Sequence, residues 1–304
     1  MKKAIVTGGT GFLGYHLIKE LINNDVEVLA VCRENSSNLD RIQKLKKVSV
    51  VCGSLNNMQK ILEKCLDRDY DVLFHLAWEG ASGVLRTSYE TQMNNVQLAC
   101  KAAEIAEKFG CRKIVVAGTI CENQCEKILQ MDEVPKSAYY LLAKKYAYEM
   151  LQVKCRQIQL KLAWCTFYHP IGWYNKTDQL IANTIKKLRE GKEPQFGPAN
   201  KWFDIIAAED LAHGFYLAAE VDLQENRYYI GSGEPRILSL YLREVGKLIN
   251  PDIVLQFGVF KDDGLPMEKS WLDVTPFQRE TGFVVQKSLE DAIFETDKWI
   301  KLLD

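Results

Sequence analysis

The sequence predicts an α/β fold, in which a doubly wound parallel sheet carries helices on both faces. Segments of strand-like and helix-like character alternate up to about residue 165, which is typical of a parallel sheet. A glycine-rich turn joins the first apolar run to the first amphipathic stretch. The length of 304 residues exceeds one average domain and leaves room for a smaller second lobe.

Hydrophobic periodicity gives the expected order of elements. Strands are expected at 3–7, 26–32, 47–52, 71–76, 113–118 and 158–164, and helices at 11–23, 38–46, 57–67, 88–109 and 137–155. We predict a dinucleotide-binding domain over 1–165, with a return segment near 203–230, and a C-terminal α/β substrate-binding lobe over 166–304. Ligands are then expected beyond the carboxyl ends of the strands.

The turn after the first strand has the spacing Gly8-x-x-Gly11-x-x-Gly14. Its first glycines allow a tight turn that brings backbone N–H groups to a pyrophosphate, and the last lets the helix pack close to the strand. The positive end of the helix then faces the phosphates. The cofactor contacts expected here are Gly8, Thr10, Gly11, Phe12, Leu13 and Gly14.

Composition excludes several classes of function. A formal net charge of −1 gives no bulk attraction to nucleic acid or an anionic membrane. The chain shows neither a signal peptide nor an apolar run of membrane-spanning length. Its nine cysteines are scattered without metal-site spacing, so we expect reduced thiols, a cytoplasmic protein and no metal.

The string TGGTGFLG, from Thr7 to Gly14, resembles the start of the extended short-chain dehydrogenases/reductases of the NAD-dependent epimerase/dehydratase type. The resemblance is strong at 3–14, 71–77 and 113–149 and weaker beyond 165. It implies a Rossmann fold and an enzyme that modifies nucleotide sugars.

The end of the second strand bears on the choice of cofactor. An acid at this point usually binds the adenosine ribose hydroxyls of NAD, whereas here Cys32 is followed by Arg33. A cation suits a 2′-phosphate, so we expect NADP(H) to be preferred, with NAD(H) as the alternative.

Further cofactor contacts are implied by the resemblance alone. Ser54 and Leu55 stand where the family usually has Asp-Leu or Asp-Ile at the adenine, and Ser54 is a weaker acceptor than aspartate. Leu76, Ala77 and Trp78 match the segment that borders the cofactor. The preceding His75 is interpreted as a packing residue. Asn95 matches an asparagine that supports the backbone around the active site and a proton-relay water.

The catalytic group is expected on the helix at 137–155. Tyr140 and Lys144 are four residues apart and so share one helix face, whereas Tyr139 has Ala143 at that offset. A nearby ammonium favours the phenolate, which brings tyrosine towards the working range of a proton-transfer group. Thr119, at the end of the strand at 113–118, would hydrogen-bond the same substrate oxygen.

Two features narrow the reaction. The family's 4,6-dehydratases carry an Asp-Glu pair directly after the hydroxyl residue, whereas here Ile120 and Cys121 follow Thr119 and the only close acid is Glu122. Dehydration is therefore disfavoured. NADP suits a reductase, whereas most 4-epimerases keep NAD tightly bound.

Residues that contact the substrate are expected in the loop after the fourth strand and in the C-terminal lobe. His169 replaces a glycine of the family's Tyr-Gly-Pro-Gly turn. Histidine tolerates a positive φ less well than glycine, so the backbone of this turn is expected to differ. Phe203 stands where relatives have an arginine for the diphosphate, so another cation must serve. The candidates are Ser82, Arg86, Glu122, His169, Lys201 and Arg236.

The sequence thus favours reduction of a 4-keto (6-deoxy) nucleotide sugar at C4. The first alternative is a nucleotide-sugar 4-epimerase with tightly bound NAD, and the second is a small-ketone reductase or a non-catalytic NADP sensor. The expected partner besides the substrate is a second copy of the chain, because the family forms homodimers through the helices at 88–109 and 137–155.

Overall fold

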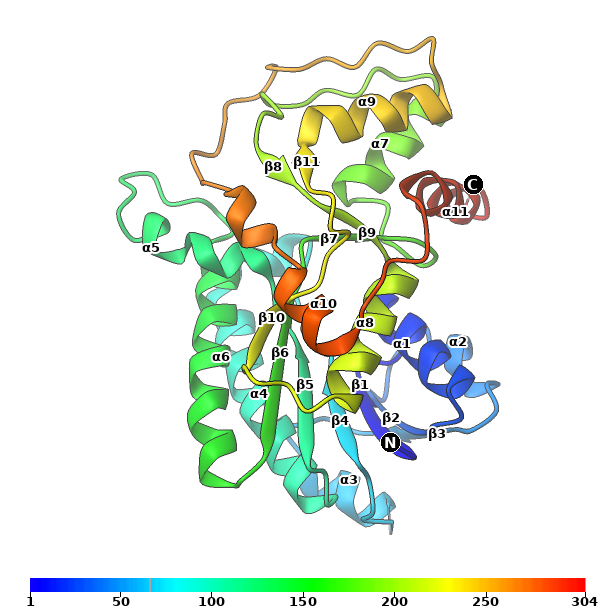
Figure 1. The fold of residues 1–304 in the computed structure, drawn as a ribbon, viewed down its shortest axis with the longest axis vertical. Helices are drawn as coiled ribbons and strands as arrows, with labels where there is room; N and C mark the ends of the chain where they lie inside the picture. Colours follow the sequence, from blue (N-terminus) through cyan, green and yellow to red (C-terminus); the bar gives the residue numbers. More distant parts are fainter. Residues whose placement is uncertain (66, 304) are drawn as a thin grey trace.

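The computed structural model describes residues 1–65 and 67–303. Its centre is a sheet of seven parallel strands in the order β10-β6-β5-β4-β1-β2-β3, which is the Rossmann arrangement (Figure 1). The strands are β1 (Lys3–Thr7), β2 (Glu27–Cys32), β3 (Val48–Cys52), β4 (Val72–His75), β5 (Lys113–Ala117), β6 (Lys161–Thr166) and β10 (Arg227–Tyr229).

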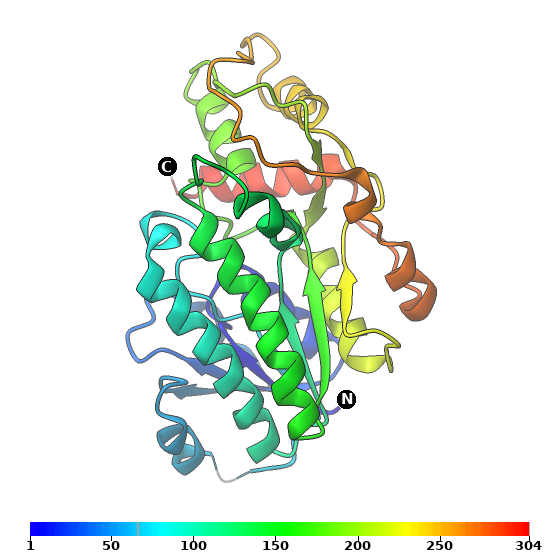
Figure 2. The same cartoon turned by 90° about the vertical axis from the view of Figure 1, so that its left-hand side faces the viewer.

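Helices cover both faces of this sheet, as the sequence predicts. The long helices α4 and α6 run side by side along one face (Figure 2), and α1 and α8 pack on the other. The elements of this part are α1 (Phe12–Asn23), α2 (Asp40–Gln43), α3 (Met58–Lys64), η1 (Val84–Thr87), α4 (Tyr89–Lys108), η2 (Ile120–Gln124), α5 (Cys125–Ile128), α6 (Ala138–Gln157) and α8 (Ala208–Glu220).

The alternation of side chains along each strand divides the core into two layers. Along β1, Ala4 and Val6 join the cluster under α1 and α8, whereas Ile5 joins the cluster under α4 and α6. Each of these side chains is fully buried. Strands buried on both faces read as continuous apolar runs, which is why the sheet is recognisable in the sequence.

Most of the remaining elements lie above the carboxyl ends of the strands (Figure 1), whereas α10 packs beside β10. Two small sheets pair β7 with β9 in parallel and β8 with β11 antiparallel. A separate apolar cluster joins α7, α9 and α11. The elements are β7 (His169–Ile171), α7 (Leu180–Arg189), β8 (Trp202–Phe203), β9 (Ile205–Ala207), β11 (Arg236–Ile237), α9 (Leu238–Ile249), η3 (Lys269–Leu272), α10 (Thr275–Thr281) and α11 (Leu289–Lys301).

Three expected elements differ in extent. The sixth strand begins at Lys161 instead of 158, because Ile158 caps α6 and Gln159 turns the chain with a φ of 55°. The second helix is reduced to Asp40–Gln43. The third ends at Lys64, and the expected range 57–67 includes residue 66, which is outside the described residues.

β10 returns to the sheet edge beside β6, and α8 packs on α1. The boundary between lobes at residue 165 stays a prediction. Within residues 1–65 and 67–303, no helix is long and apolar enough to cross a membrane.

Candidate active site

The glycine turn is held against the end of β4. Gly8 has a φ of 76°, and a Cβ built on it would lie 2.7 Å from the backbone nitrogen of Ala77. A Cβ on Gly14 would overlap the carbonyl oxygen of Gly8. The N–H of Gly11 donates to the same oxygen at 3.0 Å, and α1 begins at the next residue. The bare turn and the start of α1 together form a cradle that fits a dinucleotide pyrophosphate.

A second group of polar side chains stands beside this turn, after β2. The hydroxyl of Ser36 donates to that of Thr10 at 2.9 Å, and Arg41 Nη1 donates to the Thr10 carbonyl at 3.3 Å. The Arg41 guanidinium also lies 4.0 Å from the ring centre of Tyr174. Arg41 was missing from the predicted set, and its only sequence signal is a cation in the segment after the second strand.

Arg33 projects from the end of β2 with its side chain 78% exposed. Its Nη1 lies 2.8 Å from Glu79 Oε1, in the loop after β4. The structure therefore places the predicted cation at the expected strand end, but beside a carboxylate that competes with any phosphate.

The ends of β3 and β4 carry the next expected contacts. Ser54 is exposed, and its hydroxyl accepts a hydrogen bond from the Asn56 N–H at 3.2 Å, whereas Leu55 is buried. His75 Nδ1 shares a 2.8 Å hydrogen bond with the Thr7 hydroxyl, and burial lowers the pKa of His75 to about 3. This histidine is a neutral packing residue in the structure.

Helix α4 supports the loop that follows β4. Asn95 Nδ2 donates to the Glu79 carbonyl at 2.8 Å, and Asn95 Oδ1 accepts from the Glu79 N–H at 3.1 Å. Gln92 Oε1 accepts from Trp78 Nε1 at 2.9 Å, and Gln92 Nε2 donates to the carbonyl of Gly80 at 3.1 Å. Sequence reasoning found Asn95 but missed Gln92, although the two are three residues apart on one helix face.

Tyr140 and Lys144 are both buried, on the part of α6 that lies beside the carboxyl end of β5. Lys144 Nζ donates to the Ala117 carbonyl at 2.7 Å. Thr119, two residues further on, is also buried and begins η2, where its hydroxyl accepts from the Cys121 N–H at 3.3 Å. Because η2 packs on α6, the three predicted catalytic residues come from adjoining elements.

Burial controls the ionisation of this group. It lowers the pKa of Lys144 to about 7 and raises the pKa of Tyr140 above its ordinary value. The strongest opposing influence on Tyr140 is Arg86, whose guanidinium lies 3.7 Å from the ring centre. Without bound ligands, the Tyr140 phenol is therefore in its neutral form at pH 7.

A sequence model of the group described as "NAD dependent epimerase/dehydratase family" matches residues 4–231, more than half of the chain. The chain belongs to this family. It is thus a nicotinamide-dinucleotide enzyme of the extended short-chain dehydrogenase/reductase type, and the glycine cradle described above fits such a cofactor.

Individual relatives are distant. The chain is 24% identical to the 2-alkyl-3-oxoalkanoate reductase of Stenotrophomonas maltophilia over 96% of this chain and 97% of that protein. It is 22% identical to the dTDP-6-deoxy-L-talose 4-dehydrogenase (NAD(+)) of Aggregatibacter actinomycetemcomitans, over 84% and 94%. The solved UDP-N-acetylglucosamine 4-epimerase of Methanobrevibacter ruminantium superposes with a TM-score of 0.81 at 18% identity, covering 100% and 99% of the two chains.

Glu122, another of the substrate candidates, is buried in η2. Its carboxylate is 2% exposed, and Oε1 accepts a hydrogen bond from Trp164 Nε1 at 3.0 Å and forms an ion pair with Arg227 Nη2 at 2.9 Å. The three predicted catalytic residues are buried to a similar degree, and the role of Glu122 toward substrate stays a prediction. The sequence offered no signal for Trp164 or Arg227, because both partners come from distant strands.

Two other substrate candidates, Arg86 and Ser82, lie in the segment that follows β4. Besides contacting Tyr140, Arg86 Nη1 donates to the Ala81 carbonyl at 2.5 Å. The Ser82 hydroxyl accepts from Lys176 Nζ at 3.1 Å, which joins the loop to the segment before α7.

Of the candidates further along the chain, Lys201 and Arg236 are already in ion pairs, whereas His169 makes a ring contact. His169 lies in β7 without positive φ, its ring 5.2 Å from that of Phe203, so histidine is tolerated where a glycine was expected. Lys201 pairs with Asp262 at 2.9 Å and with Asp263. Arg236 pairs with Glu244 at 2.9 Å and with Glu234 at 3.0 Å. Their roles toward substrate stay predictions.

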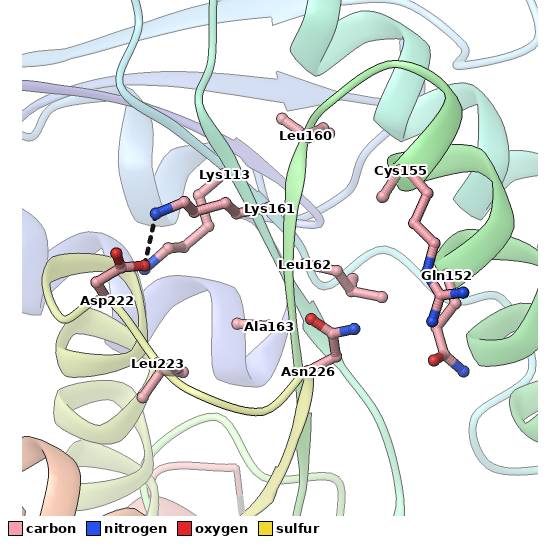
Figure 3. A pocket seen from close by; sticks show the side chains of 11 residues that line it. Lys113, Gln152, Cys155, Leu160, Lys161, Leu162, Ala163, Asp222, Leu223 and Asn226 are labelled. Atoms are coloured by element: carbon pink, nitrogen blue, oxygen red, sulfur yellow. Dashed lines mark hydrogen bonds and ion pairs between the residues drawn. The ribbon is translucent and has the colours of Figure 1, made fainter.

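A pocket of about 190 Å³ lies at the opposite, amino end of β5 and β6 (Figure 3). Both of its lysines are paired, because Lys161 forms an ion pair with Asp222 at 2.6 Å and Lys113 Nζ donates to the carbonyls of Ala218 and Ala219, both at 3.1 Å. Lys113 thereby satisfies the C-terminal end of α8. This pocket is remote from the glycine cradle, which lies at the carboxyl end of β1.

Proposed function

We propose that the protein is a nucleotide-sugar oxidoreductase that acts at sugar C4, with reduction of a 4-keto (6-deoxy) nucleotide sugar as the first candidate reaction. The observation that carries the proposal is the buried Tyr140–Lys144 pair on α6, adjoining Thr119 at the end of β5. The similarity to a dTDP-6-deoxy-L-talose 4-dehydrogenase supports both the position at C4 and the substrate class.

The residues divide the chemistry among them. The nicotinamide, when bound, accepts or supplies the hydride at the sugar carbon. In reduction, Tyr140 Oη donates its proton to the C4 oxygen, and in oxidation the same atom accepts it. The Thr119 hydroxyl hydrogen-bonds that oxygen and polarises it, and the Lys144 ammonium stabilises the phenolate and binds the nicotinamide ribose.

The second candidate is a 4-epimerase with tightly bound NAD, favoured by the fold that the chain shares with a UDP-N-acetylglucosamine 4-epimerase. It requires the same three residues. It differs in that the keto sugar forms transiently and rotates within the site, whereas a reductase binds the keto sugar as its substrate. Dehydration remains disfavoured, because Ile120 and Cys121 follow Thr119. A small-ketone reductase is favoured only by the similarity to the 2-alkyl-3-oxoalkanoate reductase, and the Tyr140–Lys144 pair argues against a non-catalytic NADP sensor.

The deciding experiment identifies the nucleotide released when the purified protein is denatured, and then measures turnover. We expect empty protein that oxidises NADPH with a 4-keto nucleotide sugar. Stoichiometric NAD, together with interconversion of 4-epimers, would instead establish the epimerase. Turnover of a 2-alkyl-3-oxoalkanoate without turnover of nucleotide sugars would contradict the proposal.

Tyr140→Phe tests the catalytic assignment. It removes the proton-transfer oxygen while keeping the buried ring, so we expect kcat to fall by about 10²-fold or more with an unchanged melting temperature. Tyr139→Phe is the matched control, because Tyr139 is the neighbouring residue on α6 and is 50% exposed. Equal activity of the two variants would refute the assignment.

We also propose that NADP(H) is the preferred cofactor. The exposed guanidinium of Arg33 at the end of β2, with Ser36 and Arg41 nearby, supports a 2′-phosphate site. Arg33→Asp should weaken NADPH binding by about tenfold or more and NADH binding much less, as measured by fluorescence titration. Arg112→Asp is the control, since Arg112 is an equally exposed arginine, paired with Asp71 at the other end of the sheet. Equal losses for both cofactors would contradict the preference.

We further propose a cytoplasmic homodimer. The nine cysteines are all free thiols, six of them buried, which suits a reducing compartment. The outer faces of α4 and α6 expose Tyr89, Met93, Tyr139, Tyr146, Met150 and Val153. These two adjacent helices would pair with the same helices of a second copy.

A further inference from the structure

The buried carboxylate of Glu122 has no role in the chemistry proposed above. Its Oε1 is bonded by Trp164 and Arg227, whereas its Oε2 is buried without a hydrogen-bond partner among the described residues. Burying a carboxylate in this way costs desolvation free energy unless nearby positive charges and hydrogen-bond donors compensate for it. Glu122 lies in η2, three residues after Thr119, and η2 packs on the helix that carries Tyr140 and Lys144. This position suggests that its charge acts on the catalytic residues.

Lys144 lies between two indole rings. Its Nζ is 3.7 Å from the ring centre of Trp78 and 5.9 Å from that of Trp164, in addition to its hydrogen bond to the Ala117 carbonyl. Trp164 therefore connects the two charges, because its N–H bonds Glu122 while its ring faces the Lys144 ammonium. Gly118 permits this arrangement, since a Cβ there would overlap the Trp164 indole nitrogen.

The charged groups around Lys144 come from five elements. Glu122 on η2 favours the ammonium, and Arg86 on η1 opposes it. His75 on β4 is neutral, because burial lowers its pKa. On the far side of Glu122, Arg227 on β10 and Lys145 on α6 stabilise the carboxylate. Cys121 faces Tyr140 as a neutral thiol, since burial raises its pKa to about 11.

We propose that Glu122 is a positioning residue that holds the Lys144 ammonium in place and in its charged form, through the Trp164 indole and through its own charge. Lys144 then stays cationic up to a higher pH than burial alone would allow. The consequence for turnover rests on the proposed function, in which charged Lys144 stabilises the Tyr140 phenolate.

The direct test follows Lys144 by NMR of protein labelled with ¹³C at lysine Cε, with the signal assigned by Lys144→Met. In Glu122→Gln we expect the titration midpoint of Lys144 to fall by about one pH unit. Glu126→Gln is the matched control, because Glu126 is an exposed carboxylate on α5 that faces Lys145 at 3.9 Å. An unchanged Lys144 midpoint in Glu122→Gln would overturn the proposal.

A test on the unaltered protein covers the case in which Glu122→Gln does not fold. With glutamate Cδ and lysine Cε both labelled, the Glu122 and Lys144 curves should each show an inflection at the midpoint of the other. Two independent single-step curves would overturn the proposal.

Kinetics separate this proposal from the proposed function. In the direction of alcohol oxidation, Glu122→Gln should shift the acidic limb of the kcat profile towards higher pH, with KM little changed. The reason is that the loss of charge on neighbouring Lys144, which raises the pKa of Tyr140, outweighs the loss of the Glu122 charge, which alone would lower it. A wild-type protein without turnover of any nucleotide sugar would contradict the proposed function, while the NMR titrations would still decide the role of Glu122. A uniform loss of kcat without a shift of the profile would contradict the positioning role.

Discussion

At the scale of single residues, the buried histidines make stability depend on pH. Burial lowers the pKa of His75 to about 3 and that of His169 to about 4. Between these values and the ordinary histidine pKa, the unfolded chain binds more protons than the folded chain, so stability is lost as pH falls. Glu122 acts in the opposite sense between pH 4.5 and about 7, because burial raises its pKa to about 7.

A variant isolates the contribution of His75. For His75 alone, acidification from pH 7 to pH 5 should cost about 2 kcal/mol of unfolding free energy. His75→Asn keeps a polar group opposite Thr7 without a proton to gain, so its loss over this range should be smaller by that amount, as measured by urea denaturation. His213→Asn, at a half-exposed histidine paired with Glu20, should behave as the wild type. Equal losses in all three proteins would disprove this account.

Residues were predictable where a local pattern determines them. The Tyr140–Lys144 pair is recognised from its spacing within one helix, and the glycines from their spacing within one turn. Both lie in the structure where the sequence pattern indicates. Partners across elements were not predictable, because nothing local to Arg33 shows that Glu79 will stand beside it. The same holds for Glu122, which reads as a free acid in the sequence yet is bound from β6 and β10.

At the scale of elements, buried strands and long helices follow from periodicity, whereas short elements depend on tertiary contacts. All six predicted strands of the main sheet are present, and the largest error is the start of β6. The seventh strand, β10, has three residues and is stabilised by pairing with β6. It lies within the return segment expected near 203–230, where the sequence predicts a short strand from Arg227, although three residues give little periodic signal of their own.

Lys113 shows how one element can stabilise another in a way that the sequence conceals. It begins β5, which alone would suggest an exposed strand end, yet its ammonium is buried against the last carbonyls of α8. The interaction fixes α8 on the sheet face and so helps to position the return segment. It requires residues separated by more than a hundred positions, which no local pattern relates.

At the scale of the whole molecule, the exposed face of α4 and α6 is a surface that the single chain leaves uncovered. Tyr146, Met150 and Val153 are 49%, 54% and 55% exposed and follow one another at helical spacing. The edge-to-face contact of Tyr89 with Tyr139, with ring centres 5.7 Å apart, continues this apolar surface from α6 onto α4. We therefore expect this apolar face to be an interface with another molecule.

Met150→Glu tests whether that interface joins two copies. The chain has a mass of 34.8 kDa, so we expect light scattering on the eluting wild type to give twice that value. A carboxylate at the centre of the paired helices would have to be buried without a partner, so the variant should elute as a monomer at micromolar concentration. Leu240→Glu is the control, because Leu240 is 54% exposed on α9, outside this face, and its variant should remain dimeric. A monomeric wild type, or a dimer that survives Met150→Glu, would show that this face does not join two copies.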